Sequence, residues 1–282
     1  RLYIDGTELG KTPVGSLTPD HINRWWARVK DSGRNNAHQV LSKVLQGAVL
    51  LGDRPDNPLK RCPDVKRKRK RTEVEPLTVA EIEALADAAG AERRGVSEYV
   101  RERDRLLVLV LGYAGLRAGE AAALRPSDLV NGCRLRVHRA VNKVTREDAY
   151  VGEPKSDAGK RTVTVACSLW DDLRAFAVRF DVPATAVLFH GKDDALLHHQ
   201  AVNHVISGAG ERIGLDVNSH QLRHSAVSLL IDGGANPRQV QTFVGHSDIR
   251  MTLGTYGHLF DQSGQDLANI MENLREQHRN GD

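Results

Sequence analysis

Three nitrogen-bearing side chains gather at the start of one predicted helix. In SHQLRHSAVSLLIDGG, residues 219–234, His220, Arg223 and His224 follow one another at i, i+3 and i+4. This spacing places all three on one face of a helix. A histidine bonded to the backbone, with two neighbours facing solvent, would explain one of them but not the whole set. The cluster therefore predicts a ligand at this end of the helix.

A metal ion is one candidate for that ligand. His220 and His224 are four residues apart, as in the HxxxH zinc pattern. However, Gln221 follows the first histidine, where a zinc metalloprotease carries glutamate. His246 would have to supply a third ligand from a separate segment. A metallohydrolase built on these three histidines remains an alternative, and it predicts an activity that depends on metal.

Further polar residues stand in short segments elsewhere in the chain. Arg117 lies in AGLRAGE, Lys155 in EPKSDAGKR, and His246 and Tyr256 in VGHSDIRMTLGTYGHLF. Each has an ordinary local interpretation. Arg117 is well placed to pair with Glu120 at i+3, the lysine is typical of a solvated hairpin, and the tyrosine is typical of an amphipathic helix.

Taken together, these side chains share a chemistry. Two arginines offer planar forks that match pairs of phosphate oxygens. Histidines can donate to the same oxygens or move a proton near neutral pH, and a loop lysine can reach a leaving-group oxygen. A tyrosine hydroxyl becomes a nucleophile when cations favour its phenolate. Clustered cations also stabilise the charge of a phosphoryl-transfer transition state. The set therefore predicts a phosphodiester substrate.

In this order and spacing, the residues resemble the active set of the tyrosine recombinases, the phage-integrase family of site-specific DNA recombinases. The set consists of Arg117, Lys155, His220, Arg223, His246 and Tyr256. GLRAGE, HQLRH, VGHS and TYGHL each look like boxes of that family. The resemblance is strong over about residues 76–260. Residues 17–64 look like the family's helical core-binding domain, with weaker motifs.

The resemblance implies site-specific recombination of the integrase or excisionase type. Tyr256 would attack the scissile phosphate, giving a 3′-phosphotyrosyl link and a free 5′-hydroxyl. Arg117 and Arg223 would hold the non-bridging oxygens. Because the covalent link conserves the phosphodiester energy, neither ATP nor a metal cofactor is expected. A partner strand's 5′-hydroxyl would then attack the link, which implies a homotetramer on double-stranded DNA.

The remaining members of the set receive roles from the same resemblance. His220 would exchange a proton with the nucleophile, and His246 would donate a hydrogen bond to the phosphate. Lys155 would protonate the departing 5′-oxygen. Glu120 and His224 are supporting residues, and Glu120 is expected to orient Arg117 or His220.

The elements that must position these residues begin with a helical region over residues 1–64. Thr18 is a suitable N-cap for a helix in LTPDHINRWWARVK, and a second apolar-periodic segment over residues 35–52 ends at a glycine. This region is predicted to be the DNA-binding core-binding domain. Since the chain begins at Arg1, we expect it to start inside that domain, without the arm-type domain that many integrases carry.

The larger region, residues 76–282, combines helices with a few strands. Thr78 and Glu81 have capping-box spacing, and a buried helix follows over residues 103–117. Later helical segments include NPRQVQTFVG and an amphipathic one at 265–274, suited to packing on a neighbouring protomer or on its own domain. Alternation of apolar and polar residues predicts strands over residues 134–141, 149–156 and 161–166. The fold class is mainly α (α+β), a helical core-binding domain followed by a larger helical catalytic domain with a small antiparallel sheet.

A run of six cations separates the two regions within the predicted linker, residues 65–75. The run consists of Lys66, Arg67, Lys68, Arg69, Lys70 and Arg71. Its ordinary interpretation is a solvated linker or a targeting signal, and alone such a run is as typical of a linker as of a nucleic-acid contact. Beside a phosphodiester site, we interpret it as DNA-binding.

The composition narrows the cellular setting. Hydrophobic residues make up 40% of the 282 residues and charged residues 27%, which is typical of a globular chain. The longest apolar run, Leu106–Leu116, is about half the length that spans a bilayer, so no membrane partner is expected. The three cysteines, Cys62, Cys133 and Cys167, form no CxxC motif. This favours a reducing cytoplasm and argues against disulfides.

Two further functions remain open from sequence. A type IB topoisomerase would relax DNA with the same chemistry, and a non-catalytic protein would bind DNA without cleaving it. The box spacing favours a recombinase over the first, and the presence of Tyr256 and Lys155 argues against the second. A recombinase would be bacterial or phage-encoded, associated with the nucleoid, and would act on attachment-type sites with a possible accessory directionality factor.

Overall fold

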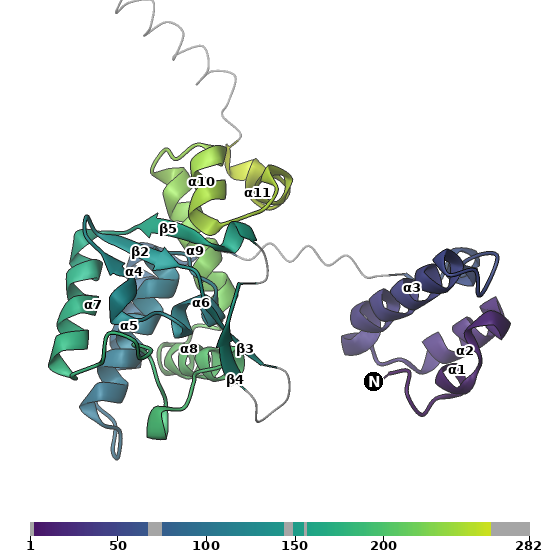
Figure 1. Cartoon of the computed structure of the whole chain (residues 1–282), viewed down its shortest axis with the longest axis horizontal. Coiled ribbons are helices and arrows are strands. Elements are labelled where there is room, and N and C mark those ends of the chain that lie inside the picture. The colour runs from purple at the N-terminus through teal and green to yellow at the C-terminus, as the bar shows by residue number, and fades with distance from the viewer. Residues whose placement is uncertain (1–2, 67–74, 144–148, 155–156, 261–282) are drawn as a thin grey trace, which may run out of the picture. The chain divides into compact units, whose positions relative to one another are not determined.

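The computed structural model describes residues 3–66, 75–143, 149–154 and 157–260, and the chain forms two compact units (Figure 1). The first unit is Arg1–Glu73 and the second is Val74–Asp282. The division between them falls inside the range predicted for the linker. Among the described helices, none has the length and apolar character needed to cross a bilayer.

The first unit is helical. Its helices are α1 (Glu8–Lys11), α2 (Pro19–Arg28) and α3 (Arg34–Leu50). Thr18 caps α2 as predicted, since its hydroxyl accepts from the backbone N–H of His21. The core of this unit forms where Ile22 and Trp25 of α2 and Leu41 and Leu45 of α3 are buried together.

The second unit contains eight α-helices in its described part. They are α4 (Val79–Gly90), α5 (Glu98–Tyr113), α6 (Ala118–Ala122), α7 (Cys167–Arg179), α8 (His199–Ile213), α9 (Ser219–Asp232), α10 (Pro237–Val244) and α11 (Ile249–Tyr256). The predicted capping box at the start of α4 is present, because Thr78 and Glu81 bond reciprocally. Asn236 caps α10, and Gly245 ends it with a φ of 67°.

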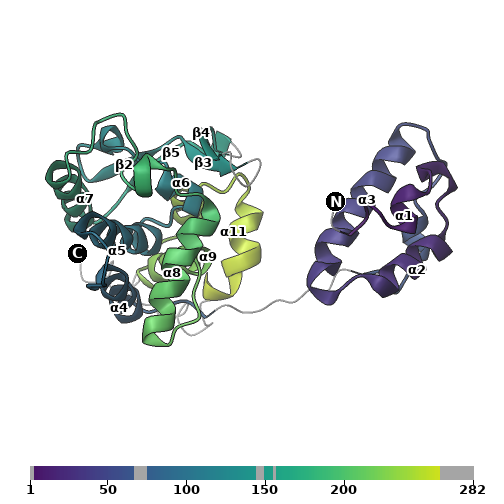
Figure 2. The same ribbon diagram turned by 90° about the horizontal axis from the view of Figure 1, so that it is seen from below.

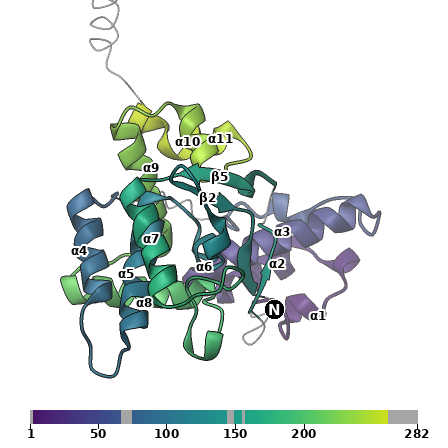
Figure 3. The same ribbon diagram turned by 60° about the vertical axis from the view of Figure 1, so that its left-hand side comes forward.

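The hydrophobic core of the second unit is built around α5. This helix packs against α4, α7 and α9 (Figure 2). It is buried on most sides, including at Leu107, Val108, Val110 and Leu111, which explains its nearly continuous apolar sequence. Helices α10 and α11 lie together beside β5 (Arg161–Thr164), at one end of the unit (Figure 3). The core thus packs α9, which carries part of the predicted site, against α5.

The strands form two small antiparallel sheets, where we expected one. The first has the order β1-β2-β5, with β1 (Leu129–Val130) and β2 (Arg134–Val137). The second pairs β3 (Ala140–Lys143) with β4 (Ala149–Gly152). The segment predicted as one strand, residues 134–141, is therefore divided. The chain turns at His138 and Arg139, and the guanidinium of Arg139 donates to the buried carboxylate of Asp128 at 2.5 Å.

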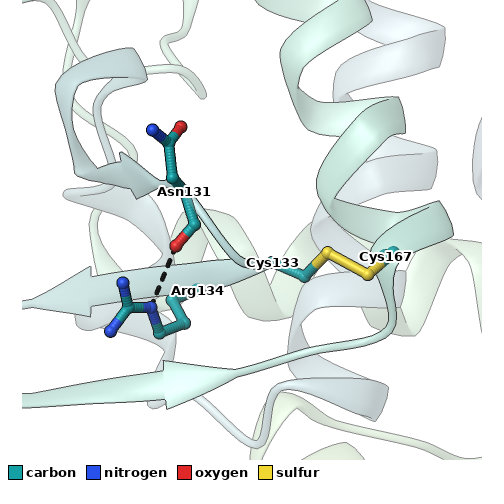
Figure 4. Close-up of a disulfide and its surroundings, with 4 residues drawn as sticks. All are labelled: Asn131, Cys133, Arg134 and Cys167. Carbon is teal, nitrogen blue, oxygen red and sulfur yellow. Dashed lines mark hydrogen bonds between the residues drawn. A yellow bond between two sulfur atoms is a disulfide. The ribbon is translucent and has the colours of Figure 1, made fainter.

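A disulfide joins Cys133, between β1 and β2, to Cys167, the first residue of α7 (Figure 4). The prediction against a disulfide is therefore wrong. Pairing of β2 with β5 places Arg134 opposite Thr164, and the N–H of Val165 donates to the carbonyl of Cys133 at 2.9 Å. This register brings two cysteines that are 34 residues apart in sequence to a Cα–Cα distance of 5.0 Å. Sequence spacing alone does not contain that information.

We expect reduction of this disulfide to destabilise the second unit. Opening a loop of 34 residues returns conformational entropy to the unfolded chain, and the free energy of unfolding should fall by about 2–4 kcal/mol. Urea unfolding with and without dithiothreitol measures the change. The double variant Cys133→Ser/Cys167→Ser is the control, because the reductant should not alter its stability. Equal stability of the oxidised and reduced protein would contradict the prediction.

Candidate active site

The structure brings the described members of the predicted set together from four segments. Arg117 precedes α6, and His220 and Arg223 lie in the first turns of α9. His246 follows α10, and Tyr256 is the last residue of α11. Because α9 packs against both α5 and α10, and α10 packs against α11, these segments meet at one place.

Some of the predicted site residues lie outside the described residues. They are Lys155 and the cations from Arg67 to Arg71. Lys66, the first cation of the basic run, is described and exposed. The predicted segment at 265–274 also lies outside the described part. On either side of Lys155, Lys160 pairs with Glu153 at 2.8 Å. The described residues thus lie on both sides of residues 155–156, which we call the lysine loop.

Glu120 is the centre of the cationic site. Its buried carboxylate accepts from Arg117 twice, from the guanidinium at 2.7 Å and from the backbone N–H at 3.0 Å. Arg161 donates to the same carboxylate at 3.1 Å, and a guanidinium nitrogen of Arg223 lies 4.0 Å away. Burial favours the neutral acid, but the charge and hydrogen bonds of Arg161 and Arg117 outweigh it and lower the pKa of Glu120. The pairing with Arg117 is the one that the i+3 spacing offers, and a role of Glu120 in orienting Arg117 or His220 stays a prediction.

Arg223 is a buried cation that binds to backbone. Its side chain is 5% exposed, and it donates to the carbonyl of Gly115 at 2.5 Å and to that of Val244 at 2.6 Å. Burial and repulsion from Arg117 lower the pKa of Arg223 to about 9. Three guanidinium groups therefore share one carboxylate, and the site is short of negative charge. An anion that binds here would relieve that imbalance.

Arg161, at the start of β5, belongs to this cluster and was not predicted. Besides Glu120, it donates to the carbonyls of Phe243 at 2.7 Å and Gly159 at 3.2 Å. The sequence contains a signal that would have identified it. Alternation places Arg161 on the same strand face as the buried Val163, and a charged residue on an inward face needs a buried partner.

Tyr256 contacts one of the two histidines of α9. Its hydroxyl forms a hydrogen bond with Nδ1 of His224, and the rings of His220 and His224 meet edge-on with centroids 4.4 Å apart. Burial and repulsion from His220 and Arg223 lower the pKa of His224 to about 4, so the imidazole is neutral at pH 7. His220 also has a lowered pKa, because of burial and then of Arg223 and Arg117. The direct contact of Tyr256 is thus with His224.

The ionisation of Tyr256 differs from the expectation that nearby cations favour its phenolate. The residue is 6% exposed, and burial raises the pKa of Tyr256 to about 12, with Arg223 opposing the shift only in part. In the protein without DNA the side chain is therefore a neutral phenol. Loss of its proton therefore requires an acceptor.

His246 is held by its own turn. Its Nδ1 lies 3.0 Å from the hydroxyl of Thr252, which is fully buried, and Thr252 was not predicted. Gly245 has a φ of 67°, and a Cβ there would lie 2.5 Å from the carbonyl oxygen of Ala158. The glycine of the VGHS box thus permits the close packing that fixes His246. Burial and then repulsion from Arg223 and Arg117 lower the pKa of His246 to about 4.

The two lowered pKa values predict a loss of stability in acid. His224 and His246 titrate near 4 in the folded protein, against 6.5 for an unperturbed histidine. Between these values the unfolded chain binds protons that the folded protein does not. As the pH falls from 6.5 to 4, the free energy of unfolding should decrease by about 1–2 kcal/mol for each of these half-buried groups, less than the ~3 kcal/mol of the full shift because solvent screens part of it. Urea unfolding at several pH values measures it. The His246→Gln variant should show a shallower dependence, and an equally steep one would contradict the assignment.

In the described part of the chain, no three histidine, cysteine, aspartate or glutamate side chains are grouped as a metal-binding set. The metallohydrolase alternative needs His220, His224 and His246 as such a set. Instead, Nδ1 of His224 and Nδ1 of His246 each form a hydrogen bond with a hydroxyl group, those of Tyr256 and Thr252.

Comparison with known proteins places the chain among integrases. Residues 75–263 match the Phage integrase family. The chain is 28% identical over 255 residues to the integrase of Mycobacterium phage D29, covering 87% of the chain and 64% of that protein. It is also 28% identical over 204 residues to transposase A of transposon Tn554 from Staphylococcus aureus, covering 70% of the chain and 52% of that protein. The chain thus spans less than two thirds of either relative.

Solved structures show the same fold. A Tn1549 transposon integrase in complex with transposon right-end DNA aligns with a TM-score of 0.76 at 20% identity, covering 96% of this chain and 90% of that one. A lambda integrase dimer bound to a COC′ core site aligns with a TM-score of 0.58 at 17% identity, covering 90% and 67%. The family match covers most of the chain and includes the whole cationic site. The chain therefore belongs to the phage integrase family.

Proposed function

We propose that the chain is the core of a tyrosine-type site-specific recombinase, which cleaves and rejoins double-stranded DNA through a 3′-phosphotyrosyl intermediate. The observation that carries the proposal is the group of Arg117, Arg161 and Arg223 around the single carboxylate of Glu120, next to the hydroxyl of Tyr256. A scissile phosphate would supply the missing negative charge and place phosphorus beside a nucleophile.

In this mechanism, Arg117 and Arg223 bind the non-bridging oxygens of the scissile phosphate. The side chain of Arg117 is 41% exposed, which leaves room for a ligand beside its bond to Glu120. His246 donates a hydrogen bond to the same phosphate. These donors are fixed before the substrate arrives, so they stabilise the transition state with little reorganisation.

The chemical step exchanges one phosphate ester for another. The Tyr256 oxygen forms a bond to phosphorus as the bond from phosphorus to the 5′-oxygen breaks. His220 accepts the phenolic proton, with His224 holding the hydroxyl until DNA binds, and Lys155 protonates the departing 5′-oxygen. Both imidazoles have lowered pKa values, which leaves a nitrogen able to accept. Rejoining reverses these steps, with the 5′-hydroxyl of a partner strand as the attacking group. Neither ATP nor a metal takes part in the proposed reaction.

The proposed partners follow from strand exchange. Two duplexes with attachment-type sites would be joined by a homotetramer, with a possible accessory factor that sets direction. The first unit is proposed as the core-binding, DNA-binding domain (residues 1–64), and residues 76–282 as the catalytic domain. A bacterial or phage-encoded recombinase of this kind would act in the cytoplasm on the nucleoid.

The basic run should contribute non-specific affinity for DNA. Replacing the six cations of Lys66–Arg71 by serine should weaken binding to any duplex. The slope of log affinity against log salt concentration should become less negative by up to about 5. Titrations at several salt concentrations measure the slope. A variant with six lysines keeps the charge and is the matched control. An unchanged slope in the serine variant would contradict a phosphate contact.

Covalent trapping tests the proposed function. The full-length protein is incubated with nicked duplexes from DNA flanking its own gene, with and without EDTA, and run on a denaturing gel. A recombinase gives an SDS-resistant protein–DNA band that EDTA does not remove. Loss of activity with EDTA would favour the metallohydrolase, and duplex binding without a band would favour a non-catalytic protein. Relaxation of supercoils at any sequence, without strand exchange, would favour a topoisomerase.

A further inference from the structure

We propose that Arg161 is a positioning residue that keeps Arg117 and Arg223 directed at the scissile phosphate. This inference rests on the proposed recombinase function. Arg161 lies under the site, with its side chain 6% exposed, so it contacts protein groups and acts through other residues.

The guanidinium of Arg161 joins three segments that build the site. Nη2 donates to Glu120 of α6, Nε donates to the carbonyl of Phe243 in α10, and Nη1 donates to the carbonyl of Gly159 in the turn after the lysine loop. A planar fork with several donors can satisfy three acceptors at once, which a lysine ammonium at the end of a flexible stem does not reproduce. Arg161 therefore fixes the relative positions of α6, α10 and this turn.

The charge balance at Glu120 explains why Arg161 matters for phosphate binding. The same carboxylate oxygen, Oε2, accepts from Arg161 at 3.1 Å and lies 4.0 Å from Nη1 of Arg223. Without Arg161, the buried oxygen loses a charged partner, and Arg223 is the nearest replacement. A move of Arg223 toward Glu120 would break its 2.5 Å bond to Gly115 and turn its fork away from the substrate.

Arg161 also fixes the turn that carries His246. It binds the carbonyl of Phe243, while Arg223 binds the next carbonyl, that of Val244. The next residue is Gly245, where a Cβ would lie 3.0 Å from Cδ of Arg161. Two arginines thus hold the two consecutive carbonyls that precede Gly245 and His246. Loss of either bond would displace a phosphate donor, and displacements of about 1 Å cost on the order of 100-fold in rate.

The first experiment measures adduct formation by Arg161→Met. We expect cleavage of a nicked duplex to slow by about 10- to 100-fold, with duplex affinity unchanged. Arg161→Lys keeps the charge without the planar fork, so it can be used if the methionine variant folds poorly. Its rate of adduct formation should be at least about fivefold lower than that of the wild type. Arg179→Met is the matched control, because Arg179 pairs with Glu98 at the surface of α7, and its rate should not change.

The decisive readout replaces the scissile phosphate by a neutral methylphosphonate. This substrate lacks the anionic oxygen that Arg117 and Arg223 neutralise, so a defect in holding that charge has less effect on it. The ratio of wild-type to Arg161→Met rate should fall from about 10–100 on phosphate to within about threefold on methylphosphonate. An equal deficit on both substrates, or a wild-type rate on phosphate, would overturn the proposal. Absence of any adduct from the wild-type protein on phosphate would instead refute the recombinase function itself.

Discussion

Replacing Tyr256 by phenylalanine is expected to abolish the covalent protein–DNA adduct while leaving duplex binding intact. The change removes one oxygen from a side chain that is 6% exposed, so the packing of α11 on α9 and α10 is preserved. The lost hydrogen bond to His224 should cost about 1 kcal/mol of stability. Because the phenolic oxygen would form the bond to phosphorus, its removal leaves no covalent step.

A denaturing gel of the trapping reaction measures this prediction, and a gel-shift titration measures binding in parallel. Tyr113→Phe is a matched control, because it removes another tyrosine hydroxyl, one that donates to Glu83 at 2.7 Å. The control should form the adduct at the normal rate. An SDS-resistant band that persists in Tyr256→Phe would show that another residue is the nucleophile.

The second large effect is expected from Arg223→Lys. Arg223 donates to two backbone carbonyls, those of Gly115 and Val244, and its fork is thereby held at the site. A lysine keeps the positive charge but lacks the planar fork, so it does not bind both carbonyls and phosphate oxygens together. Loss of a fixed donor to transition-state charge typically costs about 10²–10³ in rate. We expect a fall of this size in adduct formation.

Single-turnover cleavage of a nicked duplex measures the rate, and urea unfolding shows whether the variant is folded. Arg212→Lys is the matched control, since Arg212 also donates to a backbone carbonyl, that of Ala88, but lies in the last turn of α8. It should cleave normally. A rate within about threefold of wild type for Arg223→Lys would mean that positive charge alone suffices, and would contradict the proposed role of the fork.

Much of the fold could be read from the sequence, because helix ends are set by local interactions. Thr18, the pair of Thr78 and Glu81, and Asn236 all bond within three residues along the chain, and the caps at Thr18 and Thr78 are where we predicted them. The apolar run of α5 predicted a buried helix for a similarly local reason, since burial on most sides needs apolar residues on most sides. The mainly helical fold and the integrase family were likewise predicted and confirmed.

The candidate site was predicted in part. Six polar residues in a characteristic order identified the family, and the pairing of Arg117 with Glu120 follows from i+3 spacing. The catalytic role of each residue stays a prediction. The contact of Tyr256 with His224 joins residues 32 apart, and nothing in the spacing of the two helices distinguishes His224 from His220 as the partner.

The sequence by itself determined where the capped helices begin, which residues could do chemistry, and the family to which the chain belongs. The tertiary structure alone decided how distant segments meet. Arg161 reaches Glu120 across 41 residues and Phe243 across 82, and Cys133 reaches Cys167 across 34. The physical reason is that caps and helical faces depend on neighbours within about one turn, whereas burial of a charge or pairing of two thiols depends on packing of the whole unit.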